Sequence, residues 1–322
     1  MSEEFGTPRT KNEKIASLIH LYVDGGLNRR DLIRRLGRLT GGAAAAFAAL
    51  ETAGLSLAQS PAPVGDIRVA ESDPAIEWKD VSFPGKAGLV FGLLAAPRPY
   101  TGPRRGPVAP NWNGPQPAVV VIHENRGLVE HIRDVTRRVA KAGFIALGLD
   151  LLSRQGGTAA FPDDTTRGTA YGRTLQTERH EDMQSAVEFL RKQPNVVTDR
   201  VGIIGFCAGG GNILYSVYNG LPFQAAVPFY GTPPSPLPPP ESITTPLLCI
   251  YSDNDRNQAA RIPALSESLV SARVTFGIQL YKGTNHAFFN DTSPVYDRTA
   301  ALDAWARTID FLDTHLRAPL TA

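Results

Sequence analysis

Between residues 118 and 149 the sequence passes from an apolar run through an amphipathic stretch to a second apolar run. Residues 118–122 are all apolar, residues 129–142 carry apolar side chains at helical spacing, and residues 144–149 are again almost entirely apolar. Short continuous apolar runs are typical of strands buried on both faces of a parallel sheet. The pattern therefore predicts a right-handed unit of strand, helix and strand.

The same alternation continues to the C-terminus and indicates one large α/β domain over residues 75–322. The predicted strands are 201–206, 224–229, 246–251 and 274–281, and the predicted helices are 176–192, 259–272 and 299–316. Two earlier strands, 75–83 and 87–95, meet at Pro84-Gly85 and predict an antiparallel hairpin at a sheet edge. We expect an open, mostly parallel sheet with helices on both faces, which binds ligands at the carboxyl ends of its strands.

Two stretches of this domain are predicted to be loops that shape the mouth of a pocket. Residues 153–172 are polar and contain glycine, and residues 231–240 contain six prolines. Proline on this scale is incompatible with regular structure, so the second stretch should be a stiff surface loop.

A cysteine stands where the strand 201–206 gives way to a helical stretch, predicted over 212–218. The local sequence is Gly205-Phe206-Cys207-Ala208-Gly209. A glycine-flanked residue at a sharp strand-to-helix turn is typical of a nucleophile elbow, which displays its side chain above the sheet. The N–H of Ala208 would then face a developing oxyanion, and the helix N-terminus would favour a thiolate. A lone cysteine on an apolar strand more often fills a core, so the interpretation depends on the residues that follow.

Carboxylates and a histidine follow the next strands at the same edge of the sheet. Asp253 and Asp255 come after the strand that ends at residue 251, and His286 comes after the strand that ends at residue 281. The chain order of nucleophile, acid and histidine is that of an α/β-hydrolase triad. We favour Asp255 as the acid because it lies further into its loop, whereas Asp253 beside the strand end is better suited to capping a turn. Glu124 follows the first parallel strand and reaches the same edge.

These motifs resemble the dienelactone hydrolase family over about residues 80–316. The resemblance rests on three segments: His123-Glu124-Asn125-Arg126-Gly127-Leu128, Gly205-Phe206-Cys207-Ala208-Gly209-Gly210 and Gly283-Thr284-Asn285-His286-Ala287-Phe288. It implies an α/β-hydrolase fold, a triad of Cys207, Asp255 and His286, and a second oxyanion donor at the N–H of Asn125. It also implies that Glu124 controls the ionisation of the thiol, that lactones or esters are the substrates, and that no metal or cofactor is needed.

The sequence departs from this family where a substrate carboxylate would bind. Members of the family carry an arginine shortly after the catalytic histidine, yet residues 287–294 contain none. Arg126, Arg154 and Arg173 are alternative cations, each equally suited to a surface or an ion pair. Arg126, Phe206, Tyr230 and Phe288, which lie in these motifs or at the same strand ends, are the candidate substrate contacts.

The first 58 residues differ in composition from the rest and predict an export signal. They hold eight Lys or Arg and six Asp or Glu of the chain's 33 and 31, which leaves 25 of each sign beyond residue 58. The pair Arg29-Arg30 is followed by Leu32, Ile33 and a weakly apolar Gly/Ala-rich run at 39–50, as in twin-arginine signals read by the export machinery. Cleavage is expected at residues 56–58, with 59–74 as a linker, and the mature protein would be periplasmic. The alternative is a helical hairpin with its turn at Gly25-Gly26 in a cytoplasmic oligomer.

Composition and charge narrow the classes of function that remain open for this protein. A formally neutral domain without a basic stripe argues against a nucleic-acid partner. Two cysteines, Cys207 and Cys249, do not form a disulfide framework, and Cys249 is expected in the core. The leading hypothesis is a cofactor-free hydrolase of small esters or lactones. The alternatives are a hydrolase of acyl or xenobiotic esters that lack a carboxylate, and a catalytically silent ligand-binding protein on the same fold.

Overall fold

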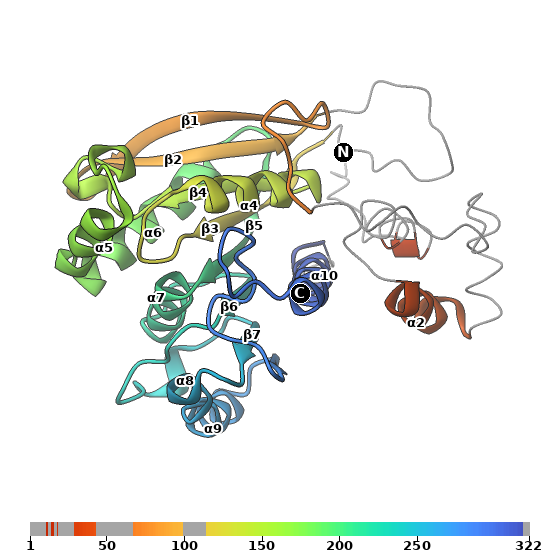
Figure 1. Cartoon of the computed structure of the whole chain (residues 1–322). Helices are drawn as coiled ribbons and strands as arrows, with labels where there is room; N and C mark the ends of the chain where they lie inside the picture. The colour runs from red at the N-terminus through yellow and green to blue at the C-terminus, as the bar shows by residue number, and fades with distance from the viewer. Residues whose placement is uncertain are drawn as a thin grey trace.

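The computed structural model contains one eight-stranded sheet in its described part, with strand order β1-β2-β4-β3-β5-β6-β7-β8 (Figure 1). The described residues are 11, 14, 15 and 18, then 29–42, 67–98 and 114–317. The strands are β1 (Ile76–Gly85), β2 (Gly88–Pro97), β3 (Gln116–Ile122), β4 (Ile145–Asp150), β5 (Val196–Phe206), β6 (Ala225–Phe229), β7 (Leu247–Ser252) and β8 (Phe276–Tyr281). Neighbours from β4 to β8 pair in parallel, and β1 and β2 pair antiparallel at one edge, which confirms the predicted sheet and hairpin.

Helices cover both faces of this sheet. The longer helices of the domain are α4 (Glu130–Lys141), α6 (Gln176–Arg191), α7 (Ala208–Tyr218), α9 (Ile262–Ala272) and α10 (Arg298–Arg317), and α8 (Arg256–Ala259) is a single turn. Side chains alternate along β3, so Val120 packs with the core under α6, α7 and α9, while Val119 and Val121 pack with the core under α4 and α10. The two cores are the reason that the parallel strands read as continuous apolar runs.

The stretch 153–172, predicted as a loop, is instead mostly helical. It contains the 3₁₀ turns η1 (Ser153–Gln155) and η2 (Thr158–Ala160) and all but the last residue of α5 (Asp164–Arg173). The side chain of Asp163 accepts a hydrogen bond from the Thr166 N–H at 2.8 Å and so caps the first turn of α5. The prediction was wrong because α5 buries only Ala170 and Tyr171, which leaves almost no apolar periodicity to detect. In the proline-rich stretch 231–240, only Pro240 lies in regular structure, as the first residue of η3 (Pro240–Ser242).

The described N-terminal residues contact the domain through α2 and through the expected linker. Helix α2 (Arg29–Thr40) buries Leu32 and Leu36, and Arg35 Nη1 donates to the Ala306 carbonyl in α10 at 3.1 Å. In the expected linker, the Val69 N–H donates to Asp134 Oδ1 in α4 at 2.7 Å. The predicted cleavage segment and the Gly25-Gly26 turn lie outside the described residues.

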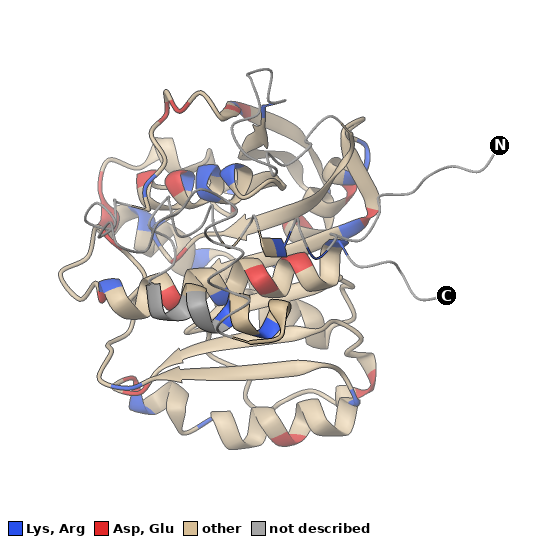
Figure 2. Ribbon diagram, turned by 90° about the vertical axis from the view of Figure 1, so that its right-hand side faces the viewer, with Lys and Arg blue, Asp and Glu red and all other residues tan. Residues whose placement is uncertain are grey.

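Basic and acidic residues are intermixed over the ribbon in the view of Figure 2. No helix within the described ranges combines the length and the apolar character that a membrane span requires. The same residues contain no cluster of three or more His, Cys, Asp and Glu side chains arranged to hold a metal ion.

Candidate active site

The candidate nucleophile lies in a sharp turn between β5 and α7. Cys207 has φ 54° and ψ −115°, in the positive-φ half of the Ramachandran map, which residues other than glycine rarely adopt. Its N–H donates to the Phe229 carbonyl at 3.0 Å, and its carbonyl accepts the Gly211 N–H at 3.1 Å. These bonds hold the strained residue at the end of the sheet, where its side chain is half-buried.

The flanking glycines allow this turn to pack. A Cβ on Gly205 would lie 3.0 Å from the Gly209 carbonyl group, and a Cβ on Gly209 would lie 2.5 Å from the His123 carbonyl oxygen. Both approaches are too close for a side chain, so the first turn of α7 rests directly on the backbone that follows β3. The helix begins at Ala208, four residues before the predicted stretch, because this packing offsets the weak helix propensity of three successive glycines.

The structure brings His286 and Asp255 together and assigns Asp253 to another contact. His286 Nδ1 lies 2.7 Å from Asp255 Oδ2. Asp253 Oδ1 instead accepts the Gly283 N–H at 2.7 Å, which ties the turn after β7 to the turn after β8. Because the Asp255 carboxylate faces Nδ1, that nitrogen donates and Nε2 is the ring atom left for chemistry.

Glu124 is buried at the same edge of the sheet and is only partly hydrogen-bonded. The residue is 8% exposed, and its Oε2 accepts a hydrogen bond from Asn290 Nδ2 at 3.1 Å. The other oxygen, Oε1, has no partner within the described part of the chain. The amide of Asn290 is oriented by Thr292, whose N–H and hydroxyl both donate to Asn290 Oδ1. Asn290 was not among the predicted site residues, although it lies in the stretch 287–294, where the arginine of the family is absent.

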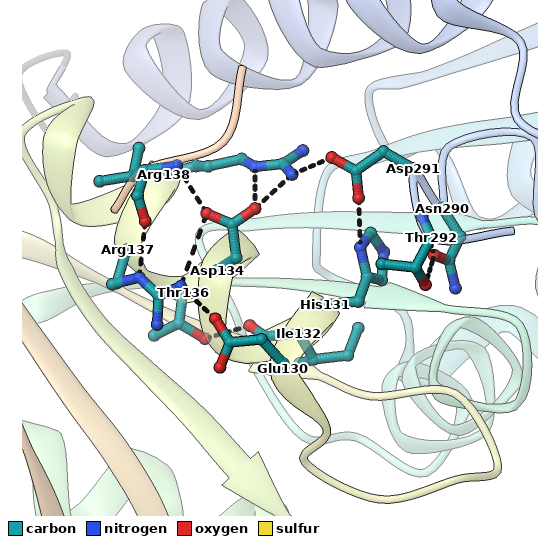
Figure 3. A network of polar contacts seen from close by, with 11 residues as sticks. Glu130, His131, Ile132, Asp134, Thr136, Arg137, Arg138, Asn290, Asp291 and Thr292 are labelled. Carbon is teal, nitrogen blue, oxygen red and sulfur yellow. Dashed lines mark hydrogen bonds and ion pairs between the residues drawn. The ribbon is translucent and has the colours of Figure 1, made fainter. Parts of the chain in front are cut away.

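A charged network anchors the segment after His286 to α4 (Figure 3). Asp291 Oδ1 lies 3.0 Å from His131 Nδ1, and Asp291 Oδ2 accepts from Arg138 Nη2. Arg138 also donates to Asp134 through Nε, at 2.9 Å. Burial would raise the pKa of Asp291, but its contacts with His131 and Arg138 outweigh that effect and lower the pKa to about 2. These pairs hold the neighbouring Asn290 in place, although the sequence pattern shows them only as charges on an amphipathic helix.

The candidate substrate contacts lie in different environments. Tyr230 is fully buried at φ 38°, its ring centroid lies 5.0 Å from that of His286, and its hydroxyl has no partner among the described residues. Phe206 and Phe288 have fully buried side chains, and Phe206 packs on Phe229 and Phe289 in the core under α4 and α10. The strand alternation turns Phe206 into that core and away from the strand ends.

The three arginines considered as partners for a substrate carboxylate either form ion pairs or are exposed. Arg126 Nη1 lies 3.0 Å from Asp164 Oδ2, and both side chains are about half exposed. Arg154 is held by Glu181 and Asp182. Arg173 is exposed at the end of α5. Of the three, Arg126 also acts on the candidate nucleophile, because its charge lowers the pKa of Cys207.

The thiol of Cys207 is held in its neutral form. Burial raises its pKa to about 11, with further contributions from the charges of Glu124 and Asp255, while the Ala208 N–H and Arg126 act in the opposite direction. A thiol with a pKa of 11 is ionised in about one molecule in 10⁴ at pH 7. Without substrate, the site therefore contains a neutral thiol that reacts weakly and resists oxidation.

Removing the Glu124 charge should increase the reactivity of this thiol. In Glu124→Gln the pKa of Cys207 falls, and each unit of decrease raises the thiolate fraction about tenfold. The rate of iodoacetamide labelling at pH 7, followed by intact mass, measures this change. Glu188→Gln, at an exposed position on α6, is the matched control and should label at the wild-type rate. Equal or slower labelling of Glu124→Gln would contradict the prediction.

Comparison with known proteins places the chain among enzymes with this fold. The model of the dienelactone hydrolase family matches residues 106–316, more than half of the chain. A protein of Synechocystis sp. named "Putative carboxymethylenebutenolidase" is 34% identical over 223 residues, covering 63% of this chain and 88% of that protein. A Bradyrhizobium protein named "Probable 2-oxo-3-(5-oxofuran-2-ylidene)propanoate lactonase" is 29% identical over 256 residues, covering 75% of this chain and 95% of that protein.

A solved structure agrees with the sequence comparisons. The "Putative Dienelactone Hydrolase" from Klebsiella pneumoniae superposes with a TM-score of 0.64 at 25% identity, covering 74% of this chain and 98% of that one. The matched family region includes the turn at Cys207, the Asp255–His286 pair and Glu124. The chain is therefore an α/β-hydrolase of the dienelactone hydrolase family, a family of carboxylic ester hydrolases.

Proposed function

We propose that this protein hydrolyses small carboxylic esters or lactones through an acyl-thioester on Cys207. The observation that carries the proposal is the 2.7 Å contact between His286 Nδ1 and Asp255, at the sheet edge where the strained turn displays Cys207. A carboxylate that accepts a hydrogen bond from Nδ1–H keeps Nε2 unprotonated and able to act as a base. This pairing supports the three residues acting together as nucleophile, base and orienting acid.

Two steps complete the reaction. His286 Nε2 takes the Cys207 proton as the sulfur attacks the substrate carbonyl, and the ester oxygen leaves with that proton. Water, deprotonated by the same nitrogen, then attacks the thioester, and the thiol regains its proton as the carboxylic acid is released. The N–H groups of Ala208 and Asn125 stabilise the oxyanion formed in each step.

Glu124 sets the resting state in this proposal. Burial and, to a smaller extent, the charge of Glu124 raise the pKa of Cys207, so the thiol stays neutral until substrate enters. One carboxylate oxygen lacks a hydrogen-bond partner among the described residues, and the other is held only by Asn290, which supports its displacement by substrate. Once the carboxylate turns away, the thiol loses a nearby negative charge and ionises more readily.

The charges around the site favour substrates without a carboxylate. In the described part of the chain, the hydrogen-bond partner of Glu124 is the neutral amide of Asn290, and Arg126 is engaged by Asp164. An anionic substrate would therefore meet Glu124 and Asp255 without a dedicated cation. This observation favours uncharged lactones, and it also supports the second candidate, an esterase for acyl or xenobiotic esters. The names of the two relatives support lactones, although the lactone in the Bradyrhizobium protein's name, a propanoate, carries a carboxylate.

The proposal is tested by turnover and trapping on one protein preparation. The substrates are a lactone and an aryl ester, each with a matched derivative that carries a carboxylate. We expect hydrolysis of the uncharged pair, and acid quenching during turnover should trap an acyl adduct on Cys207 that hydroxylamine removes. Turnover without any adduct on Cys207, including under single-turnover conditions, would contradict the thioester. Binding of the substrates without turnover would support the silent ligand-binding protein instead.

The export signal in residues 1–58 remains a separate prediction. It rests on the pair Arg29-Arg30 followed by Leu32 and Ile33. The burial of Leu32 and Leu36 and the contact of Arg35 with α10 are equally compatible with the alternative of a retained extension.

A further inference from the structure

We propose that His123 is a positioning residue for the oxyanion hole: its imidazole holds the Glu124 carbonyl so that the next peptide N–H, that of Asn125, faces the reacting carbonyl. The inference rests on the proposed function, because it assigns the origin of one of the two oxyanion donors. His123 directly follows β3 and is fully buried.

Both ring nitrogens of His123 are engaged by backbone, and this determines the tautomer. The Leu151 N–H lies 2.9 Å from Nε2. A backbone N–H can only donate, so Nε2 is an acceptor without a proton. Nδ1 contacts the Glu124 carbonyl oxygen, which can only accept. The imidazole is therefore neutral and carries its proton on Nδ1, and burial lowers the pKa of His123 in spite of the nearby Asp150.

The planarity of the peptide bond transmits this contact to Asn125. In a trans peptide the carbonyl oxygen and the following N–H point in opposite directions. Holding the Glu124 oxygen on Nδ1 therefore directs the Asn125 N–H away from the imidazole. Among the described residues, no hydrogen-bond acceptor contacts that N–H, and Asn125 is exposed, so its donor is free to bind a ligand.

The same backbone lies against the turn that carries the nucleophile. In the sheet register Ile122 of β3 is paired with Gly205 of β5, and the first turn of α7 rests on the carbonyls of Ile122 and His123. The backbone that leads into Glu124 is thus packed against α7, and the imidazole of His123 holds the carbonyl of Glu124 itself. This arrangement sets the Asn125 donor relative to the Ala208 donor, which belongs to α7.

Two amide substitutions separate the two contacts of the ring. An asparagine amide lies at the position of Nδ1 and can still donate to the Glu124 carbonyl, whereas a glutamine amide reaches the position of Nε2 and can still accept from Leu151. We expect kcat of His123→Asn to stay within about threefold of wild type and kcat of His123→Gln to fall on the order of 10²-fold, the effect of losing one oxyanion donor. KM should change little in either variant.

Labelling of Cys207 by iodoacetamide distinguishes a positioning role of His123 from a merely structural one. If His123 only stabilised the fold, its loss would lower the labelling rate together with kcat. Alkylation forms no oxyanion, so folded His123→Gln should label at the wild-type rate while its kcat falls. The opposite order, with glutamine active and asparagine inactive, would overturn the inference and leave His123 as an anchor for Leu151. Equal losses of kcat and labelling would also overturn it.

A measurement on the wild-type chain covers the case in which the variants do not fold. Nitrogen chemical shifts of the His123 ring at neutral pH should report a protonated Nδ1 and an unprotonated Nε2. A proton on Nε2 would refute the contact. Hydrolysis that persists in Cys207→Ala would refute the proposed function, whereas Cys207-dependent hydrolysis with unaffected His123→Gln would refute the positioning role alone.

Discussion

Cys207→Ala should lose hydrolysis of every ester and lactone that the wild type turns over. The loss in kcat is expected on the order of 10⁵ to 10⁶, because the remaining triad residues cannot act without the nucleophile. The fold should survive, since the turn is held by backbone bonds from Cys207 to Phe229 and Gly211 and by the packing of Gly205 and Gly209. Steady-state turnover and circular dichroism on the same preparation measure both quantities.

Cys207→Ser is the matched variant for this prediction. It places a hydroxyl at the position of the thiol. A hydroxyl is far harder to ionise than a thiol, and this site already raises the pKa of Cys207 to about 11. We expect weak activity or none. Activity of Cys207→Ala at more than a hundredth of the wild-type rate would exclude the sulfur as the nucleophile.

Asp255→Asn should reduce kcat by about 10⁴ while the fold and the KM change little. An amide at this position can donate a hydrogen bond to Nδ1 of His286, which favours the tautomer with its proton on Nε2 and removes the base from the thiol. Asp255 also accepts weakly from the Gln258 N–H at 3.4 Å, and an asparagine oxygen can keep that contact.

Asp253→Asn is the control for Asp255→Asn. It removes a charge two residues away, but its amide oxygen can still accept the Gly283 N–H, so kcat should stay within about twofold. Adding Cys207→Ala to Asp255→Asn should cause no loss beyond that of Cys207→Ala, because residues that act as a unit are not additive. Comparable losses in Asp253→Asn and Asp255→Asn would remove the distinction between the two carboxylates.

The sheet was predictable because its strands are buried on both faces. Runs such as residues 118–122 contain only apolar residues, since Val119 and Val120 each find a core on opposite faces. Helix α5 escaped prediction because its stability comes from the Asp163 cap and from burial of Ala170 and Tyr171 rather than from an apolar stripe. Which face Phe206 turns toward likewise depends on how β5 pairs with its neighbours, so its burial was not predicted.

Some residues of the candidate site could likewise be predicted from the sequence, and others could not. Cys207, Asp255 and His286 could be proposed from the sequence because each follows a strand that ends at the same sheet edge. The groups that orient these three residues could not be proposed from the sequence. Asn290 reaches Glu124 across 166 residues of chain, and His123 acts through a peptide group that any sequence would contain. Contacts of this kind depend on the folded backbone and leave no periodic signal.

The anchoring of Asp291 to α4 determines which part of this site is free to move. Movement of the segment after His286 would separate Asp291 from both the His131 imidazole and the Arg138 guanidinium, two contacts that are buried. Rotation of the Glu124 side chain breaks one hydrogen bond, that from Asn290. On the proposed mechanism, substrate therefore promotes ionisation of the Cys207 thiol by rotating the Glu124 side chain, while the surrounding segments stay in place. The segment that carries His286 and Asn290 would therefore keep its position while the thiol becomes ionised.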